Sequence, residues 1–144
     1  MLRYSLFFLS TLCTWALFVG IGLALEVTST ILVFARDTTS AVSATSGLKG
    51  YGIPYQVVIV PQAGITLPAL TSSSTTGNYG GIIVLSEVAY EYSNGWHSAL
   101  TEAQWTELYD YQTAFKVRMV RMDVYPGPDF GELQLYAFCQ PLEN

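Results

Sequence analysis

The sequence predicts a small α/β domain with a three-layer, mostly parallel sheet, wound in a flavodoxin-like or amidotransferase-like order. Short β-branched apolar runs recur along the chain, as they do in strands that are buried on both faces. Helical patterns separate these runs, which is typical of parallel sheets. The length of 144 residues suits one domain.

The first 24 residues are predicted to form a secretory signal peptide. Arg3 precedes an uncharged apolar run over 4–25, and Gly22-Leu23-Ala24 places small residues before a cut after Ala24. The run is also just long enough to span a bilayer, so an uncleaved signal anchor is the alternative. The small residues before the predicted cut favour cleavage. The expected domain therefore covers residues 25–144, is secreted to the extracellular space or cell wall, and has no membrane attachment after cleavage.

Four strands are expected, and each is rich in apolar or β-branched residues. They are Thr28–Phe34, Tyr55–Val60, Tyr79–Leu85 and Lys116–Val124. A loop rich in serine and threonine over 64–78 separates the second strand from the third. Leu133–Phe138 is a further candidate strand, and Glu91–Ser98 is expected to be an aromatic, turn-like segment.

Two helices are expected between these strands. Thr38–Gly50 is small and polar, and a glycine at 47 or 50 would end it. The stronger helix is Thr101–Phe115, because Thr101 and Gln104 make a capping-box pattern. Five residues recur at helical spacing, which predicts that the face of Trp105 packs into the core: Trp105, Leu108, Tyr109, Gln112 and Phe115.

Composition excludes several classes of function. Without Arg3, five basic residues face eleven acidic ones, whereas nucleic-acid binding requires a basic surface. His97 is the only histidine, so the chain cannot build a histidine-rich metal site. It has no glycine-rich phosphate loop and no serine or cysteine nucleophile elbow. We therefore expect no enzymatic activity, no metal and no cofactor in this chain.

Cysteine usage leaves three readings open. Cys13 lies in the predicted signal peptide, which leaves Cys139 alone in the domain. A single cysteine in a secreted protein is a free thiol, bonds to another chain, or has a partner that this chain lacks.

Polar and aromatic side chains follow three of the predicted strands. Because the carboxyl ends of parallel strands meet at one edge of a sheet, these side chains are expected to share a rim. Carboxylates and a guanidinium suit sugar hydroxyls, and aromatic rings suit the C–H faces of sugars. The predicted ligand contacts are Arg36, Asp37, Glu87, Trp96, Asp123 and Tyr125.

Each of these residues also has a structural alternative. Asp37 would cap the next helix, and Arg36 would pair with Asp37 or with Glu87. A carboxylate pair for glycoside hydrolysis among Asp37, Glu87 and Asp123 is a further alternative, although sequence does not fix their separation. The aromatic–acidic segment that includes Trp96 either lines a groove or is a surface loop pinned by its aromatic rings, and the second reading is slightly favoured. His97 is expected to be an ordinary loop histidine.

Ten segments carry a resemblance to a known family: Ile31–Asp37, Ser43–Leu48, Gly50–Pro54, Val60–Gly64, Gly77–Gly81, Leu85–Glu87, Tyr90–Ser93, Trp96, Ser98–Thr101 and Val117–Arg121. They resemble the opening of the secreted fungal galactosaminogalactan deacetylases, and the resemblance covers nearly all of the expected domain. In that family a carbohydrate-binding module precedes a metal-dependent catalytic domain, which removes N-acetyl groups from an exopolysaccharide at an Asp/His metal site.

The resemblance is to the N-terminal module alone, since the sequence ends before any region that resembles the catalytic domain. It implies a secreted, non-catalytic module that binds an amino-sugar polysaccharide of the wall or matrix, and a downstream catalytic domain that holds the partner of Cys139. An acidic domain would attract the ammonium groups of such a polymer. The alternatives are a fragment of a metal-dependent deacetylase and a purely structural domain that folds against a downstream one.

Overall fold

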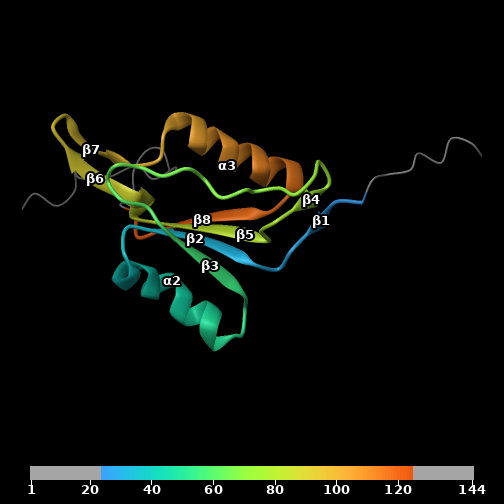
Figure 1. Cartoon of the computed structure of the whole chain (residues 1–144). Helices are drawn as coiled ribbons and strands as arrows, with labels where there is room; N and C mark the ends of the chain where they lie inside the picture. Colours follow the sequence, from blue (N-terminus) through green and yellow to red (C-terminus); the bar gives the residue numbers. More distant parts are fainter. Residues whose placement is uncertain (1–23, 125–144) are drawn as a thin grey trace, which may run out of the picture.

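A computed structural model describes residues 24–124 of the chain. A four-stranded sheet lies between two helices, α2 (Thr38–Gly50) on one face and α3 (Glu102–Phe115) on the other (Figure 1). The predicted α/β class with three layers is therefore confirmed. The predictions for the signal peptide, Tyr125, Leu133–Phe138 and Cys139 fall outside the described residues.

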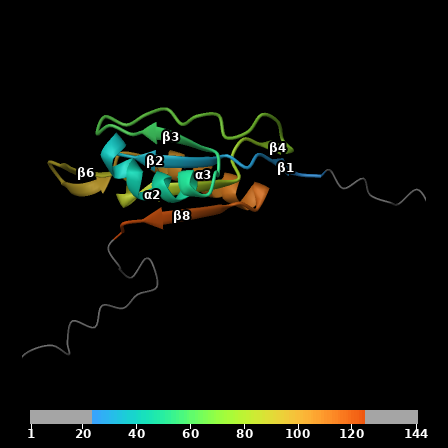
Figure 2. The same cartoon turned by 90° about the horizontal axis from the view of Figure 1, so that it is seen from below.

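Every strand pair of the central sheet is parallel, and the strand order is β3-β2-β5-β8. These strands are β2 (Ile31–Ala35), β3 (Tyr55–Ile59), β5 (Gly81–Leu85) and β8 (Arg118–Met122). Figure 2 shows β3 and β8 at the two edges. The chain first moves outward from β2 to β3 and then continues on the other side of β2, as in the flavodoxin-like order. The strand order thus reverses between β2 and β5. Open α/β sheets bind ligands at such a point, outside the carboxyl ends of the strands.

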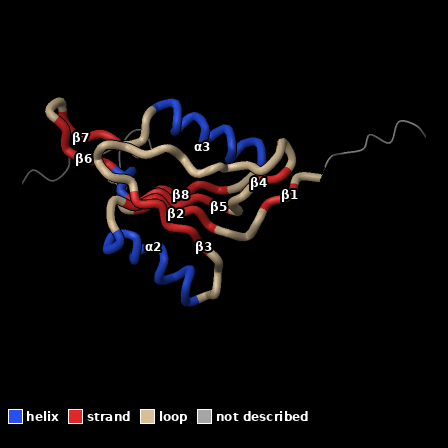
Figure 3. Tube along the Cα trace, viewed as in Figure 1, coloured by secondary structure: helices blue, strands red, loops and turns tan. Residues whose placement is uncertain are grey.

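Four shorter strands and one 3-10 helix, η2 (Ser86–Val88), complete the described structure (Figure 3). β1 (Glu26–Val27) pairs in parallel with β4 (Thr76–Gly77). β4 lies inside the segment 64–78, which was expected to be a loop. β6 (Ala89–Tyr92) and β7 (Gly95–Ser98) form an antiparallel hairpin. The prediction of a turn-like segment over Glu91–Ser98 was wrong, because these four-residue strands are mostly polar or exposed and lack a clear apolar alternation.

The larger core lies between the sheet and α3. It contains Leu32 and Phe34 from β2, which is buried from Leu32 to Ala35, and Leu108, Tyr111 and Phe115 from α3. The helical pattern predicted two of these three helix residues. Trp105 is only partly buried at the margin of this core, and Tyr109, which was expected on the same face, is 41% exposed.

The core on the other face of the sheet is smaller. Ala41 and Ala44 of α2 pack against Val33 and Ala35 of β2, and small side chains let the helix lie close to the sheet. Asp37 is the N-cap of α2 and Thr101 is the N-cap of α3, each with a complete capping box. The capping box predicted for Thr101 and Gln104 is confirmed.

One buried hydroxyl ties α3 to the start of β5. The Tyr111 hydroxyl accepts a hydrogen bond from the Tyr79 amide at 2.9 Å and donates one to the Tyr79 carbonyl at 2.6 Å. Burial raises the pKa of Tyr111, so this hydroxyl stays protonated and keeps both bonds over the ordinary pH range. The two bonds give partners to the backbone amide and carbonyl of Tyr79, which is itself buried.

We predict that Tyr111→Phe destabilises the fold by about 1–3 kcal/mol, because it leaves the buried amide and carbonyl of Tyr79 without a partner. Urea unfolding followed by circular dichroism measures this loss. Tyr51→Phe is the matched control, since Tyr51 is 86% exposed, and its unfolding free energy should change by no more than about 0.5 kcal/mol. Equal midpoints for the two variants would contradict the role given to the Tyr111 hydroxyl.

Gly80 is required by close packing between backbones. A Cβ at this position would lie 2.5 Å from the Thr28 carbonyl oxygen, and the Gly80 amide donates to the Thr30 carbonyl at 2.9 Å. We predict that Gly80→Ala costs about 1–3 kcal/mol of stability, because one backbone must move. Gly47→Ala in α2 meets no atom within 4 Å and should stabilise the protein by up to about 1 kcal/mol. Thermal melting of the two variants in parallel tests this difference in sign.

Candidate functional site

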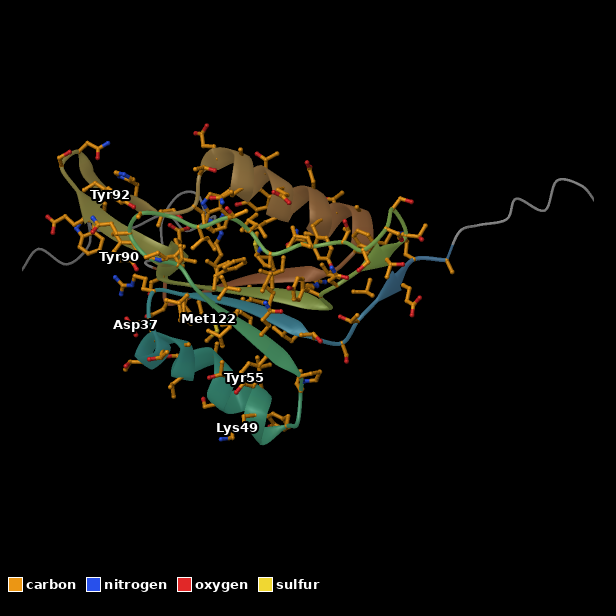
Figure 4. The ribbon with its side chains drawn as sticks, viewed as in Figure 1. Asp37, Lys49, Tyr55, Tyr90, Tyr92 and Met122 are labelled. Carbon is orange, nitrogen blue, oxygen red and sulfur yellow. The ribbon has the colours of Figure 1, made fainter. Side chains whose placement is uncertain are left out.

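The described polar residues that were predicted to share a rim do lie at one end of the sheet. Arg36 and Asp37 follow β2, Ser86 and Glu87 follow β5, and Asp123 follows β8, and all three strands run in the same direction. We call these five residues the carboxyl rim. Figure 4 shows Asp37 and Met122 at this end, together with Tyr90 and Tyr92 of the hairpin, whereas Lys49 and Tyr55 lie toward the opposite end.

Asp37 serves as the cap of α2. Its carboxylate accepts a hydrogen bond from the Ser40 amide at 2.7 Å, and the Ser40 hydroxyl is within 3.2 Å of the Asp37 amide, from which it accepts. The Ser40 amide is the largest cause that lowers the pKa of Asp37, with the neighbouring charge of Arg36 contributing less. The cap is therefore ionised at neutral pH, and its stabilisation of α2 would be lost as the pH falls through this lowered pKa.

Arg36 reaches the hairpin instead of a carboxylate. Its Nη1 donates to the Ala89 carbonyl at 3.3 Å, and its guanidinium carbon lies 6.0 Å from the centre of the Tyr90 ring. Neither expected ion pair of Arg36 is formed, because the Asp37 carboxylate caps α2 and Glu87 pairs with another arginine.

Glu87 pairs with Arg121 of β8, a residue that sequence reasoning did not select. Arg121 Nη1 lies 2.8 Å from Glu87 Oε1, and the two side chains are 24% and 34% exposed, respectively. The same guanidinium lies over Trp105 at 4.5 Å and over Tyr109 at 5.7 Å, and it donates to the Tyr109 hydroxyl. Glu87 is thus directed toward the α3 side of the sheet, away from Asp37.

The rim concentrates strained backbone. Among the described residues other than glycine, five have positive φ, and four of them lie at this end: Ser86, Glu87, Val88 and Asp123, with Lys116 elsewhere. The left-handed region is costly for such residues, above all for a β-branched one. The Ser86 hydroxyl also donates to Asp123 Oδ2 at 3.2 Å, which joins the ends of β5 and β8. Strain of this kind is commonly retained at ligand sites.

One face of the hairpin pins it to the segment that follows β3. The Tyr90 hydroxyl donates to the Val60 carbonyl and the Tyr92 hydroxyl to the Gln62 carbonyl, each at 2.7 Å. The ring of His97 stacks on Tyr92 with the centroids 3.9 Å apart. The reading of a surface segment pinned by its aromatic rings therefore describes this face, although the segment is a hairpin.

The other face of the hairpin carries Trp96 opposite Glu91. These two residues are paired across the strands, and Trp96 is 65% exposed. Side chains directly opposite each other in a sheet lie on the same face and within reach of each other. The pair therefore offers an open aromatic ring with a carboxylate beside it. The sequence placed Glu91 and Trp96 in one aromatic–acidic segment, but only Trp96 was selected as a ligand contact, because the pairing of the two residues follows from the strand register.

The described part of the chain contains neither a candidate metal cluster nor a candidate membrane span. Residues 24–124 contain no group of three histidine, cysteine or acidic side chains arranged to hold a metal ion. Within the same residues, no helix combines the length and the apolar character needed to cross a membrane.

Comparison with known proteins gives the family. A family model described as Agd3 CBM87 matches residues 27–143. A solved structure, described as that of Agd3, a novel carbohydrate deacetylase, is 59% identical with a TM-score of 0.71. The match covers 74% of this chain but only 16% of the Agd3 chain. No curated protein sequence matches.

The predicted resemblance to the module of a deacetylase family is confirmed by these matches. Together with the parallel sheet and the exposed aromatic and acidic groups at its carboxyl end, they show that this chain belongs to the CBM87 family of carbohydrate-binding modules.

Proposed function

We propose that this module binds an amino-sugar polysaccharide outside the cell, and that the hairpin and the carboxyl rim together form the binding surface. The observation that carries this proposal is the exposed Trp96 ring paired across the hairpin with Glu91, in a chain of a carbohydrate-binding family.

The chemistry of this pair suits a protonated amino sugar. A pyranose ring presents a C–H face that packs on an aromatic ring, and a nearby ammonium group is attracted to the same ring by about 0.5–1 kcal/mol at an exposed site. The Glu91 carboxylate lies beside the ring and supplies the opposite charge. Because the chain has a formal net charge of −5, the long-range field also favours a cationic polymer.

The rim supplies polar groups for sugar hydroxyls. Arg36, which is only partly buried, has guanidinium donors beyond the one used on Ala89, and Asp123 is exposed and can accept. Glu87 already pairs with Arg121 and Asp37 already caps α2, so we assign these two a supporting role in the surface.

We further propose that the module is secreted and holds the polymer without cleaving or deacetylating it. The hydrophobic leader, with small residues at its predicted cleavage site, supports secretion. Agd3 as a whole is described as a deacetylase, whereas the model matched here is that of a binding module, which supports a role in delivering polymer to chemistry performed elsewhere. Incubation of this protein with an N-acetylated polymer should therefore release no acetate, and sustained release would contradict this part of the proposal.

We predict that Trp96→Ala weakens binding to a partly deacetylated galactosamine polymer at least about tenfold, equivalent to about 1.4 kcal/mol. Sedimentation with the insoluble polymer, at several protein concentrations, measures the change. Tyr51→Ala is the matched control, because Tyr51 is another exposed aromatic residue but follows the carboxyl-terminal end of α2, away from the rim. Equal losses for the two variants, or no loss for Trp96→Ala, would count against the proposed surface.

A second prediction concerns the charge of the ligand. Glu91→Gln keeps the size of the side chain but removes its charge, so binding should weaken severalfold at low salt and become less sensitive to added salt. The loss should disappear when the polymer is fully N-acetylated, because its ammonium groups are then absent. Isothermal titration at two salt concentrations, with both polymers, tests this. A Glu91→Gln effect of the same size on both polymers would show that charge is not involved.

A further inference from the structure

A groove lies along the carboxyl-terminal half of α3, away from the hairpin. Its volume is about 410 Å³, within the range of small-molecule sites. One side is the helix from Glu107 to Phe115, and the other side is the segment 69–71. The hairpin leads into the amino-terminal end of α3 instead, so the two surfaces belong to different ends of this helix (Figure 1).

The floor of the groove is aromatic and fixed. Tyr111 and Phe115 contact each other with ring centroids 4.9 Å apart, and the two hydrogen bonds to Tyr79 hold the Tyr111 hydroxyl in place. The opposite wall is held by Asn78, whose side chain donates to the Ala69 carbonyl and whose amide donates to the Leu70 carbonyl, both at 2.8 Å. A ligand would therefore enter a preformed site with little ordering cost.

The mouth of the groove is acidic. Glu107 and Asp110 stand one helical turn apart and are both exposed, and neither carboxylate has a hydrogen-bond or ion-pair partner among the described residues. An aromatic floor under two carboxylates combines an apolar surface for the C–H face of a ring with negative charge for an ammonium group. Ala114 lines the same groove with a small side chain that leaves the space open.

We propose that this groove is a second contact site for the same polymer and takes one ammonium-bearing pyranose unit. The inference rests on the proposed function. α3 has 14 residues and is therefore about 21 Å long, so one polymer chain, but no monosaccharide, can reach both the hairpin and the groove. Two linked contacts raise the affinity for a long chain well above that for a short one.

The experiment uses ¹⁵N-labelled protein and two probes, galactosamine and a long, partly deacetylated galactosamine polymer. Ala114→Phe fills the groove, and Ala103→Phe places the same bulk at an exposed position of α3 outside it. Galactosamine should shift the amide signals of Glu107, Asp110 and Ala114 in the wild type and the Ala103→Phe variant, but not in Ala114→Phe. Polymer affinity should fall about tenfold or more in Ala114→Phe alone.

The outcomes separate this inference from the proposed function. Signals that shift in the hairpin but not around Ala114, with equal polymer affinity for both variants, would overturn the second site while the hairpin surface stands. If no amide signal shifts and the polymer does not bind, both proposals are wrong. A double variant, Glu107→Gln with Asp110→Asn, leaves the groove open, and retention of full galactosamine binding in that variant would overturn the choice of a cationic sugar.

Discussion

The parallel pairing of β2 with a strand on each side is the constraint on which the rest of the structure depends. Leu32, Val33 and Phe34 are fully buried, and β2 pairs in register with both β3 and β5. Burial of each such side chain contributes about 1.5–3 kcal/mol, and a slip by one residue would exchange the side chains of the two faces. The carboxyl end of β2 is thereby fixed beside that of β5, which sets the positions of Arg36, Asp37 and Glu87.

The regular elements could be predicted from sequence because their signals are local. Apolar, β-branched runs predicted β2, β3 and β5 to within a few residues, alternation predicted β8, and the capping box predicted the start of α3. The partners of individual side chains could not be predicted, because they depend on which face a residue occupies. Arg121 lies two residues after Met119, which packs in the α3-side core, so alternation along β8 places Arg121 on the same face, where it meets Glu87.

The hairpin was missed for a related reason, and it depends on the strained turn before it. Ser86, Glu87 and Val88 all have positive φ, a conformation that costs on the order of 1–3 kcal/mol per residue. Two interactions hold this turn: the Ser98 hydroxyl donates to the Glu87 carbonyl at 2.7 Å, and the Ala99 amide donates to the Val88 carbonyl at 3.1 Å. Burial of Val88 adds to them. The end of the hairpin thus stabilises the turn that starts it, through bonds between residues 11 positions apart that the pattern of a single strand does not reveal.

The division of roles between the two faces of the hairpin explains how so small an element could present the proposed ligand surface. An isolated two-stranded hairpin is at best marginally stable in water. Here the hydroxyls of Tyr90 and Tyr92 attach one face to the chain after β3, and Gln62 donates back to the Glu91 carbonyl at 2.8 Å. The aromatic residues on that face are therefore committed to anchoring, while Trp96 remains open on the other. Because the backbone is already held, a sugar that stacks on Trp96 would not have to order it, and more of the contact energy would remain as affinity.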